Sequence, residues 1–218
     1  MSVGVKNICC YLTGLFVMTV GIAFSIKSNL GISPVSTIPY TMTVVWGVEI
    51  GFATIIFHCI LVLIQFVLLK DKFGWDNFAQ IFVGIIFGYF TSFSVGLMNF
   101  IPDSSGIPVS LIYLAISIVV IAFGIFLYLP SNLIPLAGEG AMQAVSIVFE
   151  KPFPRVKVGF DVCMVVISAV TCLIFIHSFG SVGIGTVISA VFVGTTLKYI
   201  VKIFSKITGK QVDLKNED

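Results

Sequence analysis

Long apolar runs separated by short polar breaks are the most regular pattern along this chain. Six runs reach, or nearly reach, the ~20 mostly apolar residues that a membrane-spanning helix needs. They cover about 8–26, 51–69, 78–100, 107–129, 160–178 and 182–204. Because unpaired backbone groups are costly in lipid, each run is predicted to be a helix. The runs lack the period-two alternation of a membrane β-barrel.

Composition supports this reading. The chain of 218 residues is 58% hydrophobic and 10% charged, whereas soluble domains carry roughly 25% charged residues. So few charges leave too little polar surface to cover a water-soluble protein of this size. The sequence therefore predicts an all-α polytopic membrane protein whose partner is the lipid bilayer.

The spans fall into two halves. Ser28-Asn29-Leu30 follows the first span, and Ser131-Asn132-Leu133 follows the fourth. We expect a first three-helix repeat over 1–104, a second over 105–204 and a charged cytoplasmic tail over 205–218. Because each repeat has an odd number of spans, the second enters the membrane from the opposite side, which makes the two inverted repeats.

The positive charges predict the orientation. With the N-terminus inside, Lys27 is the one cation among the 12 Lys and Arg that falls in an outer segment. The positive-inside rule then places both termini in the cytoplasm. We expect a multi-pass protein of the bacterial cytoplasmic (inner) membrane.

Two links are too long to be simple turns. The links 27–50 and 130–159 contain apolar stretches at 35–47 and 141–149. A 13-residue helix covers roughly 20 Å of a ~30 Å hydrocarbon core, so neither stretch can span it. Each is predicted to be a half-helix or an interfacial helix. Ser33 followed by Pro34 is typical of a helix start, with Ser as the cap.

The polar residues of these links are the candidate binding site. If the half-helices enter the membrane, their N-termini and the polar clusters before them line a shared centre, as in transporters built from inverted repeats. The alternative is that these residues turn the chain at the surface. The substrate-binding candidates are Ser28, Asn29, Ser33, Ser131, Asn132 and Gln143.

Two charged residues of the links suggest further roles. Glu139 lies between two glycines in an apolar link, where a carboxylate near hydrocarbon suits ion or proton coupling. The alternative is an ordinary loop glutamate. Lys27 either extends to the outer interface or faces the outer mouth and attracts anionic solutes.

Other residues are predicted to be structural. Lys157 and Asp161 stand four apart, close enough to pair on one helix face. Gly84, Gly88 and Gly194 allow close helix packing. His58, His177 and the five cysteines lie in or beside apolar runs and are interpreted as packing residues. The cysteines lack metal-ligand spacing, so no metal site is expected.

The chain carries no recognisable catalytic or nucleotide-binding motif, so enzyme activity, a cofactor and nucleic-acid binding are not expected.

Two segments resemble a known family. Residues 26–34, Ile-Lys-Ser-Asn-Leu-Gly-Ile-Ser-Pro, resemble the "(I)(R/K)xxLGxSP" signature of the bacterial YczE/YyaS/YitT membrane-protein family. Residues 180–187 resemble that family's "GxGIGT" stretch. The resemblance implies a small inner-membrane protein, often taken to be a transporter without an agreed substrate, and assigns no functional residues.

Three functions remain open from the sequence. The first is a secondary transporter of a small polar or anionic solute. The second is a substrate-capture subunit of a multi-component ATP-driven uptake system, which requires a partner membrane subunit. The third is a non-transporting membrane scaffold or assembly factor. A homodimer is compatible with each.

Overall fold

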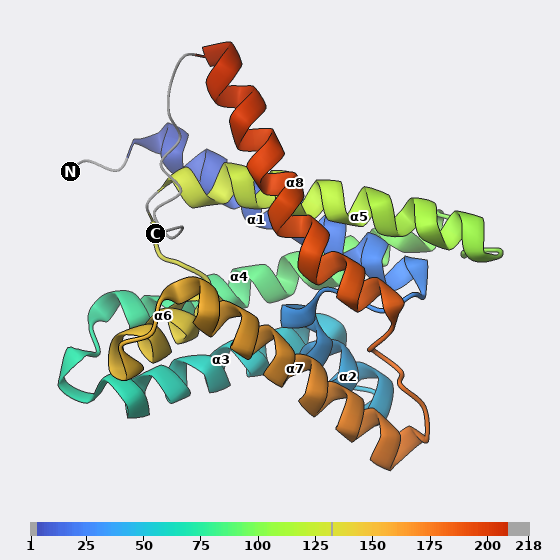
Figure 1. The fold of residues 1–218 in the computed structure, drawn as a ribbon, viewed down its shortest axis with the longest axis horizontal. Coiled ribbons are helices and arrows are strands. Elements are labelled where there is room, and N and C mark those ends of the chain that lie inside the picture. The colour runs from blue at the N-terminus through green and yellow to red at the C-terminus, as the bar shows by residue number, and fades with distance from the viewer. Residues whose placement is uncertain (1–3, 132, 209–218) are drawn as a thin grey trace. The chain divides into compact units, whose positions relative to one another are not determined.

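A computed structural model describes residues 4–131 and 133–208, and the regular structure in these ranges is helical (Figure 1). The α-helices are α1 Val5–Ser28, α2 Thr37–Trp46, α3 Ile50–Leu69, α4 Trp75–Leu97, α5 Ile107–Tyr128, α6 Ala137–Phe149, α7 Phe153–Ile176 and α8 Ile184–Thr208. Short 3-10 turns connect several of them.

Within the described residues, six helices are long and apolar enough to cross a membrane, namely α1, α3, α4, α5, α7 and α8. The prediction of six spans is confirmed, and α2 and α6 occupy the two long links. The element order long, short, long, long therefore occurs twice. α7 starts earlier than expected, at Phe153, because Pro154 lies in its first turn, where a backbone N–H has no helical partner to lose.

The expected cap of the first short helix is wrong. Pro34–Ser36 form a 3-10 turn, and α2 begins at Thr37 with Ser36, not Ser33, at the N-cap. An α-helix starting at Pro34 would need a hydrogen bond from residue 39 in its second turn, and Pro39 has no N–H. With the start at Thr37, Pro39 lies in the first turn, where that bond is not needed.

The second short helix also begins earlier than predicted. α6 starts at Ala137 rather than near 141, so Glu139 lies in the first helical turn and not in a loop. A carboxylate in the first turn interacts favourably with the helix dipole. Gly138 and Gly140, the two glycines that flank Glu139, are both helical and buried.

The chain divides into two compact units. Unit 1 contains α1, the end of α4 from Phe93, α5 and α8; unit 2 contains α2, α3, α4 up to Ser92, α6 and α7. Each unit therefore combines helices from both sequence halves. The boundaries of the three-helix repeats stay a prediction.

Unit 1 is built on α1 and α5, which pack closely. A Cβ built on Gly14 would lie 2.6 Å from the backbone nitrogen of Tyr128 and 2.8 Å from the carbonyl oxygen of Gly124. Further along α1, Gly21 meets Ile121, so the helices are antiparallel. Small residues at such crossings let the two backbones approach closely. The resulting van der Waals packing is a main source of helix association in lipid.

Unit 2 has an apolar centre formed by four helices. Phe57 and Leu61 of α3, Ala137 and Ala141 of α6 and Met164 of α7 pack together, and Val35 and Ile38 from the start of α2 pack against them.

Glu49 begins α3 by accepting a hydrogen bond from the Phe52 N–H at 2.8 Å. Burial raises the pKa of Glu49, but hydrogen bonds from Gly51, Phe52 and Ser92 outweigh it, so the pKa lies below its ordinary value.

We expect Gly14→Ala to destabilise the protein by about 1–3 kcal/mol, because the new methyl meets backbone atoms that cannot rotate away. Gly194→Ala in α8 is the matched control, since a Cβ there has nothing within 4 Å among the described residues. Thermal unfolding of both variants in lipid nanodiscs measures the difference. Equal stability of the two would contradict the close α1–α5 packing.

Candidate functional site

The two short helices meet at their N-termini in the middle of unit 2. Val35, just before α2, lies 3.4 Å from a Cβ built on Gly138 in the first turn of α6. The residues packed around this meeting point, Phe57, Leu61 and Met164, lie near the middles of the long helices α3 and α7. Neither short helix crosses unit 2; each begins near its centre.

From that centre the short helices run to opposite ends. α2 runs beside α7, where Thr41 contacts Cys172 and Trp46 contacts Phe175, and three residues then join it to the start of α3. α6 runs beside α3 towards Leu69 and is joined by three residues to the start of α7. Figure 1 shows α2 and α6 at opposite ends of α3 within this unit.

A chain of side-chain amides lies at the α6 end. The Gln65 amide nitrogen donates to Gln80 Oε1 at 2.8 Å and to the carbonyl of Ala137 at 3.2 Å. Gln65 Oε1 in turn accepts a hydrogen bond from Asn77 Nδ2 at 2.9 Å. A Cβ on Gly140 would lie 2.5 Å from Gln80 Nε2, so a side chain at this position would displace the Gln80 amide. Gln65 and Gln80 are 0% and 2% exposed.

A pocket of about 290 Å³ opens beside these amides, between the end of α3, the start of α4 and α6. Its polar lining residues are Lys72, Asp76, Asn77, Gln80 and Gln143. We call it the amide pocket. Its floor is the buried Gln80, whereas Lys72 and Asp76 are exposed at its rim. Polar side chains of this kind converging on a concavity are typical of small-molecule sites.

The α2 end of the unit carries a different polar cluster. The hydroxyls of Thr41 and Ser181 are 2.6 Å apart, and Cys172 Sγ lies 3.8 Å and 3.7 Å from them. All three residues are buried. We call this group the hydroxyl cluster. Cys172 lies four residues before the end of α7, as Gln65 lies four residues before the end of α3.

Of the predicted binding residues, Gln143 lies in the amide pocket. Ser28 and Ser131 lie near opposite ends of the antiparallel α1–α5 pair, so the structure does not bring them together. About 17 residues of helix at ~1.5 Å each separate their levels by roughly 25 Å. Each hydroxyl donates to the backbone carbonyl three residues earlier in the chain, at 2.7 Å.

The remaining candidates of the links belong to chain turns or lie outside the description. Asn29 ends α1 in the left-handed conformation, with φ 54°. Ser33 is half-buried just before the 3-10 turn. Asn132 lies outside the described residues. Glu139 is half-buried and partnered in the first turn of α6.

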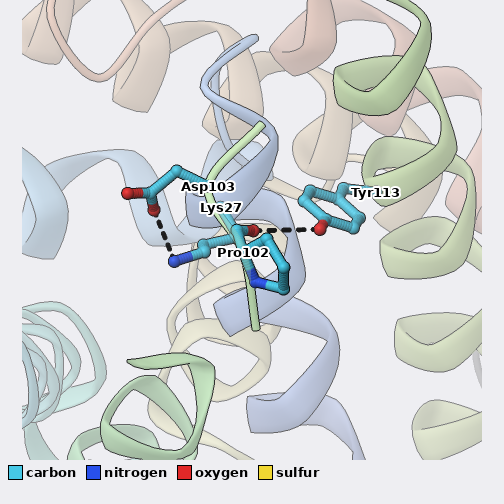
Figure 2. Close-up of polar contacts among 4 residues, drawn as sticks. All are labelled: Lys27, Pro102, Asp103 and Tyr113. Carbon is cyan, nitrogen blue, oxygen red and sulfur yellow. Dashed lines mark hydrogen bonds and ion pairs between the residues drawn. The ribbon is translucent and has the colours of Figure 1, made fainter. Parts of the chain in front are cut away.

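Neither of the two charged pairs lines the amide pocket. Lys27 forms an ion pair with Asp103, and the Tyr113 hydroxyl donates to the neighbouring Pro102 carbonyl at 3.0 Å (Figure 2). This pairing places the end of α1 and the α4–α5 link at one end of unit 1. Lys157 Nζ donates to Asp161 Oδ2 at 2.9 Å, as their spacing leads one to expect.

The glycines singled out for packing differ among themselves. A Cβ on Gly84 would meet His58, and one on Gly88 would meet Ile55 and Gly51, so both lie at the α3–α4 contact. Gly194 makes no such contact among the described residues.

Gln65, Asn77 and Gln80 were missed by the sequence reasoning. Gln65 and Gln80 are amides inside apolar runs, where a polar side chain needs a partner or a function. That signal was present in the sequence and was not used. Their convergence with α6 was not visible, because it depends on the path of the second long link.

We expect Gln65→Leu to destabilise the protein by about 1–3 kcal/mol, because Asn77 Nδ2, Gln80 Oε1 and the Ala137 carbonyl each lose a partner. Thr195→Val in α8 serves as the polar-to-apolar control, because the Thr195 hydroxyl donates to a carbonyl of its own helix. Thermal unfolding in nanodiscs compares the two. A Gln65→Leu variant as stable as the wild type would contradict a coupled amide network.

The comparisons agree with the membrane fold. The chain is 25% identical over 193 residues to the uncharacterized membrane protein YczE of Bacillus subtilis, covering 87% of this chain and 82% of that one. It is 22% identical over 202 residues to an uncharacterized protein of Haemophilus influenzae, covering 93% and 86%. No solved structure matches. The profile of a family of unknown function, DUF6198, matches residues 5–202. The expected likeness to YczE is confirmed, and this integral membrane protein belongs to the DUF6198 family.

Proposed function

We propose that this protein is a secondary transporter of a small polar solute, which binds in the amide pocket of unit 2. The observation that carries the proposal is the meeting of α2 and α6 at their N-termini, with a polar site at each far end. Short helices that begin near the middle of a membrane domain are characteristic of transporters with inverted repeats.

The difference between the two ends supports transport over a static scaffold. The amide pocket is open, whereas the hydroxyl cluster is closed by a 2.6 Å hydroxyl contact. Alternating access requires one end of a transporter to be open while the other is shut. We assign the described conformation to the state that opens on the amide-pocket side.

Charge supports a cytoplasmic amide pocket. Lys70 and Lys72 lie beside it, and Lys151 and Arg155 lie where α6 joins α7, at the same end of unit 2. A cationic end of this kind faces the cytoplasm under the positive-inside rule. Both termini are then cytoplasmic and the two halves are inverted.

Glu139 is the coupling candidate in this proposal. It lies in the first turn of α6, near the level at which the short helices meet. A carboxylate at the bilayer centre costs at least about 2.5 kcal/mol unless it is paired, protonated or hydrated. Glu139 has a partner in this structure, so coupling would consist of exchanging that partner for the proton or cation that drives transport.

A substrate-capture subunit is the second candidate function, because the amide pocket serves binding equally well. It differs in requiring a partner membrane subunit for movement of the solute. A scaffold is the third, and the open polar pocket argues against it.

Cysteine labelling in membrane vesicles tests alternating access. In a background without the five native cysteines, with Ser in place of Cys172, we expect Gln143→Cys to react quickly with a membrane-impermeant maleimide from the cytoplasmic side. Ser181→Cys reacts slowly and from the opposite side. Prior modification of Gln143→Cys with a bulky reagent then slows Ser181→Cys further, because it holds the cytoplasmic side open.

Thr54→Cys is the control for this labelling, since Thr54 is buried in α3 and its hydroxyl bonds within its own helix. Labelling of Ser181→Cys no faster than Thr54→Cys would contradict alternating access and favour a scaffold.

A further inference from the structure

The amide network has a fixed direction. The backbone N–H of Gly74, which can only donate, bonds Asn77 Oδ1 at 3.1 Å. Asn77 therefore turns its Nδ2 to Gln65 Oε1, and Gln65 turns its Nε2 to Gln80 Oε1. The Ala137 carbonyl, which can only accept, also receives a hydrogen bond from Gln65 Nε2. Both ends of the network thus require the same orientation of all three amides.

This direction decides what Gln80 presents to the pocket. Its oxygen is occupied by Gln65, so its Nε2 group, with two N–H donors, is left at the floor of the amide pocket. No hydrogen bond from Gln80 Nε2 to another described residue is found, although the residue is 2% exposed. Gln80 Nε2 is not one of the fully buried unpartnered atoms of the described residues, so it is open to the pocket, where a ligand acceptor can take the place of water.

The rest of the pocket adds charge and limits size. The exposed residue Lys72 contributes a positive charge to the lining, and Gln143 contributes an amide from α6. A volume of about 290 Å³ is at the small end of the ~300–1,000 Å³ range of ligand sites. Asp76 is the acidic group of the lining and lies at the exposed rim, so it does not replace a ligand acceptor at the floor.

We propose that the amide pocket selects small carboxylates, whose oxygens accept from Gln80 Nε2 while Lys72 compensates their charge. This inference rests on the proposed function, because it names the substrate class of the same site. Donor-only cations of equal size are rejected, since they would leave Gln80 Nε2 without an acceptor and face Lys72.

Three four-carbon probes with different head groups test this selectivity on the full chain in nanodiscs. We expect butyrate to raise the unfolding temperature and to give saturation-transfer NMR signals, butyramide to bind more weakly, and butylamine not to bind. Binding of butylamine as tight as that of butyrate would overturn the proposal.

Gln80→Glu provides the sharpest variant. A carboxylate at this position still accepts from Gln65 Nε2, but it presents an acceptor to the pocket in place of a donor. We expect butyrate affinity to fall about tenfold or more, with butylamine binding gained. Thr195→Val in α8, which is not part of the pocket lining, is the control and retains butyrate binding. Unchanged butyrate affinity in folded Gln80→Glu would overturn the proposal; if that variant does not fold, Gln143→Glu on the less buried α6 wall makes the same test.

The outcomes separate this inference from transport itself. Butyrate binding without alternating labelling of residues 143 and 181 would contradict transport and leave the carboxylate pocket standing. Alternating labelling without any preference for butyrate would leave transport standing and overturn the carboxylate assignment.

Discussion

The requirement that backbone polar groups be satisfied in hydrocarbon shapes this structure more than any other constraint. It makes every long apolar run a helix and leaves irregular backbone only where protein covers it. The two short helices test the constraint most severely, because each begins inside unit 2 with first-turn N–H groups that have no helical partner. Their starts are surrounded by α3 and α7, with Phe57, Leu61 and Met164 closing the centre. Protein, not lipid, therefore surrounds the point at which α2 and α6 meet.

The same principle explains the polar interior of unit 2. Gln65 lies in a span whose neighbours are almost all apolar, and its amide is completed by Gln80, Asn77 and the first carbonyl of α6. The network thereby connects the short helix α6 to the long helices α3 and α4 by hydrogen bonds. It also leaves the Gln80 side-chain nitrogen at the pocket, which links the stability of the unit to the proposed recognition of a ligand. Close packing of α6 depends on Gly140, because a side chain there would occupy the position of the Gln80 amide.

Hydropathy was sufficient to predict the six spans and the two short helices between them, because length and apolar content alone decide whether a segment can cross a bilayer. The starts of the short helices were harder. Pro39 moved the start of α2 to Thr37, and α6 began before the apolar stretch, taking Glu139 into its first turn. The polar residues at the ends of α1 and α5 were expected to meet, but Ser28 and Ser131 close turns at opposite ends of an antiparallel pair. The amide pocket was found only through tertiary packing, because residues 65, 80 and 140 are brought together by the path of a link whose direction the sequence does not encode locally.

The central claim is that α2 and α6 meet at their N-termini, and disulfide cross-linking tests it most directly. In a background lacking the native cysteines, a protein carrying both Val35→Cys and Gly138→Cys should cross-link rapidly under mild oxidation in membranes, because Val35 lies 3.4 Å from the Cβ position of residue 138. The pair Val35→Cys with Ile147→Cys, about 14 Å further along α6 at ~1.5 Å per residue, should not. Failure of the first pair to cross-link, or equal cross-linking of both pairs, would contradict the account.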